Sequence, residues 1–355
     1  MKILQVITSL QTGGAEKLIT DIAPRLRNKG NQVEVLVFDG AESPFRKKLE
    51  DCGIKVYNFG INCNVYNPLF IFRLVPFMHK YDIIHTHNTA CQYFAAIAKT
   101  ISFSKVKLVT TEHSTTNRRR NIWWFKPLDK WMYRRYSSII AISNKAAELL
   151  TQYIDNKNNI STVFNGIDVT AIRDAKPVSE VSERTIVTMV AGFRDQKDQD
   201  TLIRAMALLP ESYELWLVGD GPRRGICEEL VSHLNLNERV KFLGIREDVP
   251  RILKASDIIV MSSHWEGFGL AAVEGMAAGK PVVASDVPGL CEVIKGYGLV
   301  FKQGESEQLA KKVMDLNNTE YYNLISTICQ KRADDFDISK MVDGYERIYE
   351  SIAGK

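Results

Sequence analysis

Short apolar segments alternate with segments of helical spacing along this chain, and that alternation limits the possible fold more than any other feature. In the first half, runs rich in β-branched residues occur at 2–8, 32–38, 82–87, 107–111 and 138–143. Between the first two runs, Leu18, Ile22 and Leu26 fall on one helical face, and Gly30 is a stop signal. Strands apolar on both faces, each followed by a helix, are typical of a parallel sheet covered on both sides.

The same pattern is repeated in the second half. After a polar stretch at 173–184, apolar runs occur at 185–192, 213–221, 239–244, 257–263, 281–285 and 298–301. We therefore predict an α/β protein with two Rossmann-like, doubly wound parallel-sheet domains, 1–170 and 171–335. A C-terminal helix within 336–355 is expected to pack back toward the first domain. Because ligands bind at the carboxyl ends of parallel strands, two such domains facing one another would form a binding cleft.

The composition is that of a soluble globular protein, with 45% hydrophobic and 25% charged residues among 355. No apolar run approaches the ~18 to 20 residues needed to cross a bilayer, and the first residues lack the features of a signal peptide. We expect a cytoplasmic protein. Its six cysteines are scattered singly, which favours reduced thiols over a disulfide framework.

Charge is divided unevenly between the two halves. Residues 1–165 hold 23 Lys and Arg against 12 Asp and Glu, whereas residues 166–355 hold 23 against 30. The net charge is therefore +11 in the first half and −7 in the second. Either the first half faces an anionic partner, such as a phosphate-bearing substrate or a lipid surface, or both surfaces are simply solvated. No nucleic-acid recognition motif accompanies the basic charge, so nucleic acid is not an expected partner.

The segment EGFGLAAVE, residues 266–274, carries the clearest sign of chemistry. It follows a predicted strand end, and a helix is expected from about Gly269 to the stop signals Gly279 and Pro281. The first backbone N–H groups of a helix have no partner within it and form an anion site. Here these are the amides of Phe268, Gly269 and Leu270.

Two carboxylates flank those amides, and carboxylates accept paired hydrogen bonds from sugar hydroxyls. We predict that Glu266 holds sugar hydroxyls, that the amides hold a diphosphate and that Glu274 holds ribose hydroxyls. The alternative is purely structural: an acidic residue that favours the helix dipole and a glutamate on the helix surface.

The segment resembles the E-x7-E motif of retaining glycosyltransferases of family 4 (glycosyl transferases group 1), which have the GT-B fold. Other segments resemble that family's landmarks in the same order: TGGAEK, DIIHTHN, TEHS, VFNGID, QKDQDTLIRA, LVGDGP, FLG and GKPVVASDVPG. Each is weak alone, but the ordered set covers nearly the whole chain. The resemblance implies a hexosyltransferase-type glycosyltransferase (EC 2.4) that moves a sugar from a nucleoside-diphosphate sugar to a glycan or polyprenyl-diphosphate-linked acceptor in cell-surface polysaccharide synthesis.

The same resemblance implies roles for individual residues. Lys197 would neutralise the diphosphate of the donor, a UDP- or GDP-sugar held mainly by the second domain. Gly13 and Gly14 would leave room in a loop beside the phosphates and the acceptor, and His87 would lie beside the reacting sugar carbon. The loop at 245–250 would contact the base.

One position departs from the family pattern. The family commonly has an arginine after the first strand of its second domain, where this chain has Gly192; Arg194 is the expected substitute. Lys197, Arg194 and the helix amides would stabilise negative charge on the departing phosphate. No Asp-x-Asp pair stands at a predicted strand end, so we expect neither a metal nor another cofactor. Retention implies attack from the leaving-group face, with the donor phosphate taking the acceptor's proton.

Three histidines allow a different interpretation. His85 and His87 share one face of a strand, and His113 ends another, so the three could bind zinc. No carboxylate or cysteine partner is evident, and we favour contact with sugar or acceptor for His87 and a structural role for His85.

The segment RRRNIWWFKPLDKWMYRRY, residues 118–136, has seven basic and six aromatic residues with one aspartate. Such a segment suits an anionic membrane surface, where it would place the protein at the inner face of the plasma membrane as a peripheral protein. It equally suits a helix whose aromatics pack on the sheet and whose arginines are solvated.

Other functions are less consistent with the sequence. A GT-B nucleotide-sugar epimerase or a phosphorylase would use a similar two-domain arrangement. An NAD-dependent oxidoreductase is disfavoured, because GDGPRRG is a loose match to the dinucleotide motif and the turn after the first strand lacks G-x-G-x-x-G. A non-catalytic sugar-binding protein would not need so many charged groups at strand ends.

Overall fold

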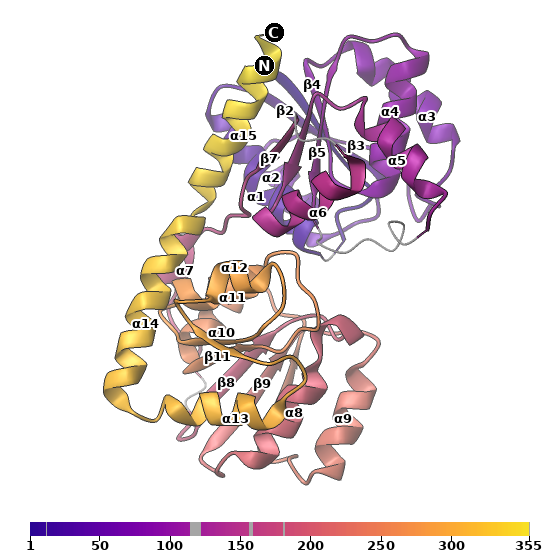
Figure 1. The fold of residues 1–355 in the computed structure, drawn as a ribbon. Helices are drawn as coiled ribbons and strands as arrows, with labels where there is room; N and C mark the ends of the chain where they lie inside the picture. The colour runs from indigo at the N-terminus through magenta and orange to yellow at the C-terminus, as the bar shows by residue number, and fades with distance from the viewer. Residues whose placement is uncertain (12, 114–121, 156–158, 180–181, 355) are drawn as a thin grey trace. The chain divides into compact units, whose positions relative to one another are not determined.

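The computed structural model describes all residues of the chain except 12, 114–121, 156–158, 180–181 and 355. The chain forms two compact units (Figure 1). Unit 1 comprises Met1–Asn165 together with Ser339–Lys355, and unit 2 comprises Gly166–Ile338. The unit boundaries lie within a few residues of positions 170 and 335. None of the described helices is long and apolar enough to cross a membrane.

Unit 1 is built on a parallel sheet with strand order β3-β2-β1-β4-β5-β6-β7 in the described residues. The strands are β1 (Lys2–Ile7), β2 (Gln32–Asp39), β3 (Val56–Gly60), β4 (Ile83–Thr86), β5 (Lys107–Glu112), β6 (Ser138–Ala141) and β7 (Ile160–Thr162). Its helices are α1 (Gly14–Asn28), α2 (Pro44–Asp51), α3 (Leu69–Leu74), η1 (Val75–His79), α4 (Thr89–Ile101), α5 (Phe125–Tyr133), α6 (Asn144–Ile154) and α15 (Ile338–Ala353).

Unit 2 repeats this plan with strand order β10-β9-β8-β11-β12-β13, again all parallel. Its strands are β8 (Thr185–Val190), β9 (Tyr213–Val218), β10 (Val240–Gly244), β11 (Ile258–Met261), β12 (Val282–Ser285) and β13 (Leu299–Phe301). Its helices are α7 (Val169–Arg173), η3 (Asp195–Lys197), α8 (Gln199–Leu208), α9 (Arg224–His233), α10 (Val249–Ala255), α11 (Leu270–Ala277), α12 (Leu290–Ile294), α13 (Ser306–Asp315), α14 (Thr319–Ala333) and η4 (Asp334–Phe336). The predicted doubly wound α/β architecture is confirmed in both halves.

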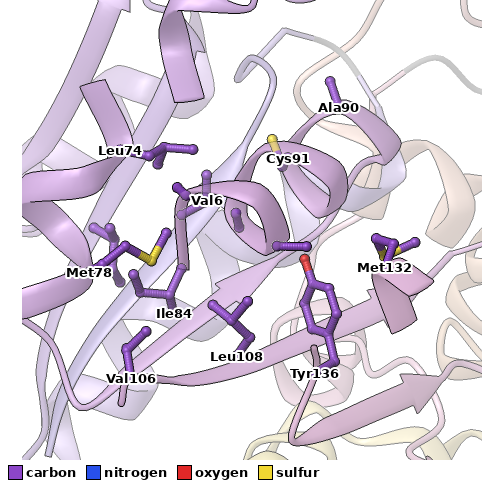
Figure 2. Packing of buried hydrophobic residues seen from close by; sticks show 14 of the residues in the cluster. Val6, Leu74, Met78, Ile84, Ala90, Cys91, Val106, Leu108, Met132 and Tyr136 are labelled. Carbon is purple, nitrogen blue, oxygen red and sulfur yellow. The ribbon is translucent and has the colours of Figure 1, made fainter. Parts of the chain in front are cut away.

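Apolar packing on both faces fixes the inner strands. All four residues of β4, of β6, of β11 and of β12 are buried. Figure 2 shows part of the unit 1 core, where Val6, Ile84 and Leu108 from three adjacent strands lie among side chains of the covering helices. Such strands form continuous apolar runs because both their faces are covered.

The sequence analysis did not identify two strands, β3 and β7, which lie at the two edges of the unit 1 sheet. An edge strand pairs on one side only and packs less completely. Accordingly, one residue of β3 is buried and none of β7 is.

Local signals fix where several helices begin. Ser43 Oγ accepts a hydrogen bond from the Arg46 amide at the start of α2, and Ser143 Oγ accepts one from the Ala146 amide at the start of α6. At α8 the cap is Asp198, whose carboxylate accepts from the Thr201 amide. These side chains satisfy backbone N–H groups that the helix itself leaves unpaired.

Helix α11 approaches strand β11 closely through Gly275. A Cβ atom on Gly275 would lie 2.8 Å from Ile259 Cγ1, and Ile259 is fully buried. The absence of a side chain at this position therefore sets the separation between helix and sheet. Helix α11 carries Glu274, for which the sequence analysis predicts a contact with ribose.

Gly275→Ala is expected to lower the free energy of unfolding by about 1–3 kcal/mol, because the added methyl group overpacks a closed contact. Gly225→Ala, within α9, is the matched control: nothing lies within 4 Å of its Cβ position, so its stability should be unchanged or raised. Thermal unfolding, with hydrogen exchange of the α11 amides, would measure both effects. Equal stability of the two variants would contradict the assigned packing.

Candidate functional site

The strand order of unit 2 reverses between β8 and β11, so the chain leaves these neighbouring strands toward opposite faces of the sheet. In open α/β sheets such a switch point is where ligands bind. Lys197 follows β8, and Glu266 follows β11. The Lys197 ammonium donates a hydrogen bond to Glu266 Oε1, and the two form an ion pair. The fold thus brings together two residues that the sequence analysis singled out separately.

The loops that carry this pair are joined by further hydrogen bonds. The His264 amide donates to the carbonyl of Gln196 at 2.8 Å, and Gln196 Nε2 donates to the carbonyl of Trp265 at 2.8 Å. Ser262 Oγ donates to the carbonyl of Asp198 at 2.7 Å. Ser263 Oγ lies 3.2 Å from Glu266 Oε1 and donates to it. The ion pair is therefore held on connected loop backbones.

Phe268 and Gly269, which follow Glu266 in the sequence, have distinct structural roles. Gly269 has a φ of 90°, a left-handed conformation that favours glycine, and it precedes the first residue of α11, Leu270. The Phe268 ring is buried and contacts the Phe336 ring edge-on, with centroids 5.2 Å apart. The ring thus anchors the loop, and Phe268 can offer a ligand its backbone only.

Glu274 lies in the second turn of α11 and is 6% exposed.

The loop before α11 is tightly enclosed, since a Cβ atom on Gly289 would lie 2.5 Å from the Glu266 carbonyl oxygen. A bulkier residue at 289 would displace the loop that positions Glu266.

Arg194, the expected substitute for the family's arginine, is exposed and directly precedes η3. Its Nε lies 3.9 Å from the position that a Cβ atom on Gly192 would occupy. The Arg194 side chain therefore lies next to position 192, where the side chain of the family's arginine would start.

Unit 1 reverses its strand order between β1 and β4, and the other predicted residues lie in the segments after these strands. Gly13 and Gly14 are exposed at the start of α1. A Cβ atom on Gly13 would lie 2.1 Å from a carboxylate oxygen of Glu16. Because Gly13 has no side chain, the Glu16 carboxylate can lie close to the N-terminus of α1, where the helix dipole favours negative charge.

His87 lies directly after β4 and is 3% exposed. Its Nε2 lies 2.6 Å from Gln5 Oε1, and its Nδ1 lies 3.1 Å from His113 Nε2. His85, whose ring centroid is 4.3 Å from that of His87, binds Tyr349 Oη through Nδ1 and Thr111 Oγ1 through Nε2. Both side chains lie on one side of the sheet, as predicted.

Burial holds these imidazoles neutral. Loss of hydration lowers the pKa of His85 and of His87 well below the usual value, and the neighbouring histidines lower it further. The pKa of His113 is lowered to about 4, also by burial. In the described part of the chain these histidines do not belong to a group of three His, Cys, Asp or Glu side chains that could hold a metal.

The basic aromatic segment contains both buried and exposed aromatic rings. Residues 118–121 lie outside the described residues, but the rest can be placed. Tyr133 and Tyr136 belong to the buried core of unit 1. By contrast, Trp123 is 86% exposed and Trp124 is 53% exposed.

Sequence reasoning missed the polar residues that surround His87. Gln5 is the single polar residue between Ile3 and Ile7 of β1, and it is fully buried. Tyr345 and Tyr349 are four residues apart on α15, and both are fully buried. A glutamine within an apolar strand and a tyrosine pair on an amphipathic helix were the available signals.

Comparison with known families agrees with this geometry. Residues 12–171 match the model of Glycosyltransferase Family 4, and residues 172–331 match that of Glycosyl transferases group 1. The chain belongs to this glycosyltransferase family. It is an enzyme of the glycosyl-transfer class, with the GT-B fold.

The relatives of this glycosyltransferase differ in their substrates. It is 26% identical to N-acetyl-alpha-D-glucosaminyl L-malate synthase of Bacillus anthracis, over 95% of this chain and 93% of that protein. It is also 26% identical to UDP-Gal:alpha-D-GlcNAc-diphosphoundecaprenol alpha-1,3-galactosyltransferase of Escherichia coli, over 76% and 75%. Among solved structures, Anabaena HepE in complex with UDP-glucose has a TM-score of 0.87 and 27% identity, with all of both chains covered.

The glycosyltransferase is expected to lose stability as the pH falls below about 6.5. In the folded state the pKa of His113 is about 4, whereas an unfolded histidine titrates near 6.5. Between these values the unfolded chain binds more protons, which costs at most about 1.4 kcal/mol per pH unit for each such histidine. Above pH 6.5 this contribution is constant.

His113→Gln should therefore weaken the pH dependence of the unfolding free energy between pH 6.5 and pH 4. The control is His233→Gln, a substitution of an exposed histidine, which should keep the wild-type slope. Chemical unfolding at a series of pH values measures both. An unchanged slope in the His113 variant would show that this imidazole does not remain neutral in the folded protein.

Proposed function

We propose that this enzyme is a retaining glycosyltransferase that transfers a sugar from a uridine-diphosphate sugar to a glycan or polyprenyl-diphosphate-linked acceptor in cell-surface polysaccharide synthesis. The observation that carries the proposal is the Lys197–Glu266 pair at the switch point of unit 2. It combines a cation suited to a diphosphate with a carboxylate suited to sugar hydroxyls. The likeness to HepE in complex with UDP and with UDP-glucose supports uridine over guanosine.

Charge complementarity assigns the roles. The Lys197 ammonium, already held by Glu266, is shared with the diphosphate of the donor, and Arg194 adds a second cation. The backbone amides of Phe268, Gly269 and Leu270 bind phosphate oxygens. As the glycosidic bond breaks, negative charge grows on the departing phosphate, and these groups stabilise it.

The two glutamates hold the neutral parts of the donor. Glu266 accepts hydrogen bonds from hydroxyls of the transferred sugar, and Glu274 accepts them from the ribose. Because Glu274 lies on a helix and Glu266 on a hydrogen-bonded loop, both carboxylates are positioned before the donor binds.

The proposed reaction needs no metal and no other cofactor, because cationic side chains and helix amides stabilise the departing diphosphate. The acceptor hydroxyl attacks the anomeric carbon from the face that the diphosphate leaves, so configuration is retained. The departing phosphate oxygen takes the hydroxyl proton. His87, in unit 1, contacts the reacting sugar, and Gly13 and Gly14 leave room for the acceptor.

We propose that the enzyme is a peripheral protein on the cytoplasmic side of a membrane. Its N-terminal half, on the acceptor side, contacts that membrane. Trp123 and Trp124 expose large amphipathic rings, and the half of the chain that contains them has a net charge of +11. Rings of this kind bind at the headgroup level of a bilayer, and basic charge attracts anionic lipid. A relative whose substrate is diphosphoundecaprenol-linked supports a lipid-linked acceptor.

UDP is expected to raise the melting temperature of the wild-type enzyme, and Lys197→Ala and Glu274→Ala should each reduce that shift. A lost ionic or hydroxyl contact of about 1.5–3 kcal/mol corresponds to a roughly 10- to 100-fold rise in Kd. Thermal-shift titration with UDP, GDP, ADP and NAD measures this and identifies the base.

Lys312→Ala, on the surface of α13, is the control for a lost lysine and should bind UDP like the wild type. Stabilisation by NAD alone, or equal UDP affinity in all variants, would reject the proposed donor site.

The enzyme is expected to float with anionic liposomes at low salt, and the double variant Trp123→Ala/Trp124→Ala should bind them at least several-fold more weakly. The control is Phe103→Ala, which removes another exposed aromatic ring (91% exposed). Liposome flotation measures the bound fraction. If the wild-type protein stays in the unbound fraction, the membrane proposal fails and a soluble acceptor is favoured.

A further inference from the structure

A chain of largely buried hydrogen bonds connects the C-terminal helix to His87 within unit 1. It runs through seven side chains: His113, His87, Gln5, Tyr349, His85, Thr111 and Tyr345. Gln5, His85, Tyr345 and Tyr349 are fully buried. Within a low-dielectric interior, each such group needs a compatible donor or acceptor, so the proton positions along the chain depend on one another.

Gln5 sets the direction of this chain, because its amide has one end that only donates and one that only accepts. Its Nε2 donates to Tyr349 Oη at 3.2 Å. Its Oε1 lies 2.6 Å from His87 Nε2 and must accept. His87 Nε2 therefore carries the proton, and His87 Nδ1 presents its lone pair toward His113.

The same logic extends in the other direction. Tyr349 Oη accepts from Gln5, so its own proton is available for His85 Nδ1, 2.6 Å away. His85 Nδ1 is then the acceptor, and His85 Nε2 carries the proton that it donates to Thr111 Oγ1 at 2.8 Å. We therefore expect the two histidines to share one tautomer, although no hydrogen bond joins them directly.

We infer that Tyr349 and Gln5 are positioning residues that fix His87 as the Nε2-protonated tautomer, with Nδ1 as a hydrogen-bond acceptor. Tyr349 lies on α15, more than 250 residues from His87 in the sequence, and acts on it through Gln5. Both side chains are fully buried, so each acts through its neighbour in the chain of hydrogen bonds. This inference rests on the proposed function only in assigning His87 to the reacting sugar.

A fixed tautomer limits what His87 can do. With Nε2–H donated to Gln5, the remaining ring nitrogen can accept a hydrogen bond but not donate one. His87 Nδ1 accepts from His113 Nε2, 3.1 Å away, and a hydroxyl group of the sugar or the acceptor would take the place of that donor. A mixture of tautomers would place a proton on Nδ1 in part of the molecules, where it could not accept that hydroxyl hydrogen.

Side-chain nitrogen-15 NMR distinguishes protonated from unprotonated ring nitrogens and tests the inference in the full-length enzyme. In the wild type, His85 and His87 should both be protonated at Nε2. Tyr349→Phe removes the partner that orients Gln5, so His87 should become a mixture of the two tautomers. Tyr345→Phe is the matched control, because Tyr345 is equally buried on the same helix but contacts Thr111 at the far end of the chain.

Protonation of both histidines at Nδ1, or of each at a different nitrogen, would overturn the inference. So would an unchanged His87 tautomer in Tyr349→Phe when circular dichroism shows that the variant is folded. Gln5→Leu provides a second check, because it removes the acceptor of the Nε2 proton and should also yield mixed tautomers of His87.

Hydrolysis of UDP-glucose, in which water accepts the glucosyl group and UDP leaves, separates this inference from the proposed function. Tyr349→Phe should lower kcat about tenfold, the equivalent of about 1.4 kcal/mol or one hydrogen bond, with little change in KM for the donor. Tyr345→Phe should not. If the tautomer changes as described but kcat does not, the positioning role stands and the proposed contact between His87 and the sugar is wrong.

Discussion

The reversal of strand order at the centre of each sheet is the constraint on which the functional architecture depends. A parallel strand must be followed by a helix on one face, and at the reversal two neighbouring strands send their helices to opposite faces. Polar side chains can gather in the space that this leaves at the carboxyl ends. In unit 1 the residues there include His87 beside Gln5, and in unit 2 they are Lys197 and Glu266. One topological rule, applied twice, therefore places a polar centre at the switch point of each domain.

The two centres handle the cost of burying polar groups in different ways. In unit 2 the charges are kept and paired, since Lys197 donates directly to Glu266 and Ser263 adds a further hydrogen bond to the same carboxylate oxygen. In unit 1 burial keeps His85 and His87 neutral by lowering their pKa, and every ring nitrogen of the two has a hydrogen-bond partner. A paired charge suits a site for an ionic ligand. A neutral, oriented network suits a site that recognises hydroxyl groups.

The structural features that were predicted from the sequence are those with strong local patterns. The continuous apolar runs identified the inner strands, and the Gly269 and Gly279 signals bounded α11 within about two residues. The edge strands β3 and β7 were not predicted, because a strand with one neighbour needs no continuous apolar run. The Lys197–Glu266 contact joins residues 69 positions apart and was approached through family resemblance. The network around His87 was missed: Gln5 stood out as a glutamine among apolar strand residues, but no local pattern shows that Tyr349 returns to lie beside it.

The return of the chain to unit 1 also has a consequence for how the protein is made. Domains generally fold as units while the chain is being synthesised, N-terminal first. Here residues 1–165 emerge first, yet Gln5, His85 and Thr111 each have a hydrogen bond to Tyr345 or Tyr349 of α15. Until those two tyrosines have been added, unit 1 keeps buried polar groups without these partners, so it cannot reach its final stability. Unit 2 lies between these two parts of unit 1 in the sequence, so it is synthesised before α15. Unit 1 can therefore be completed only after unit 2 has been made.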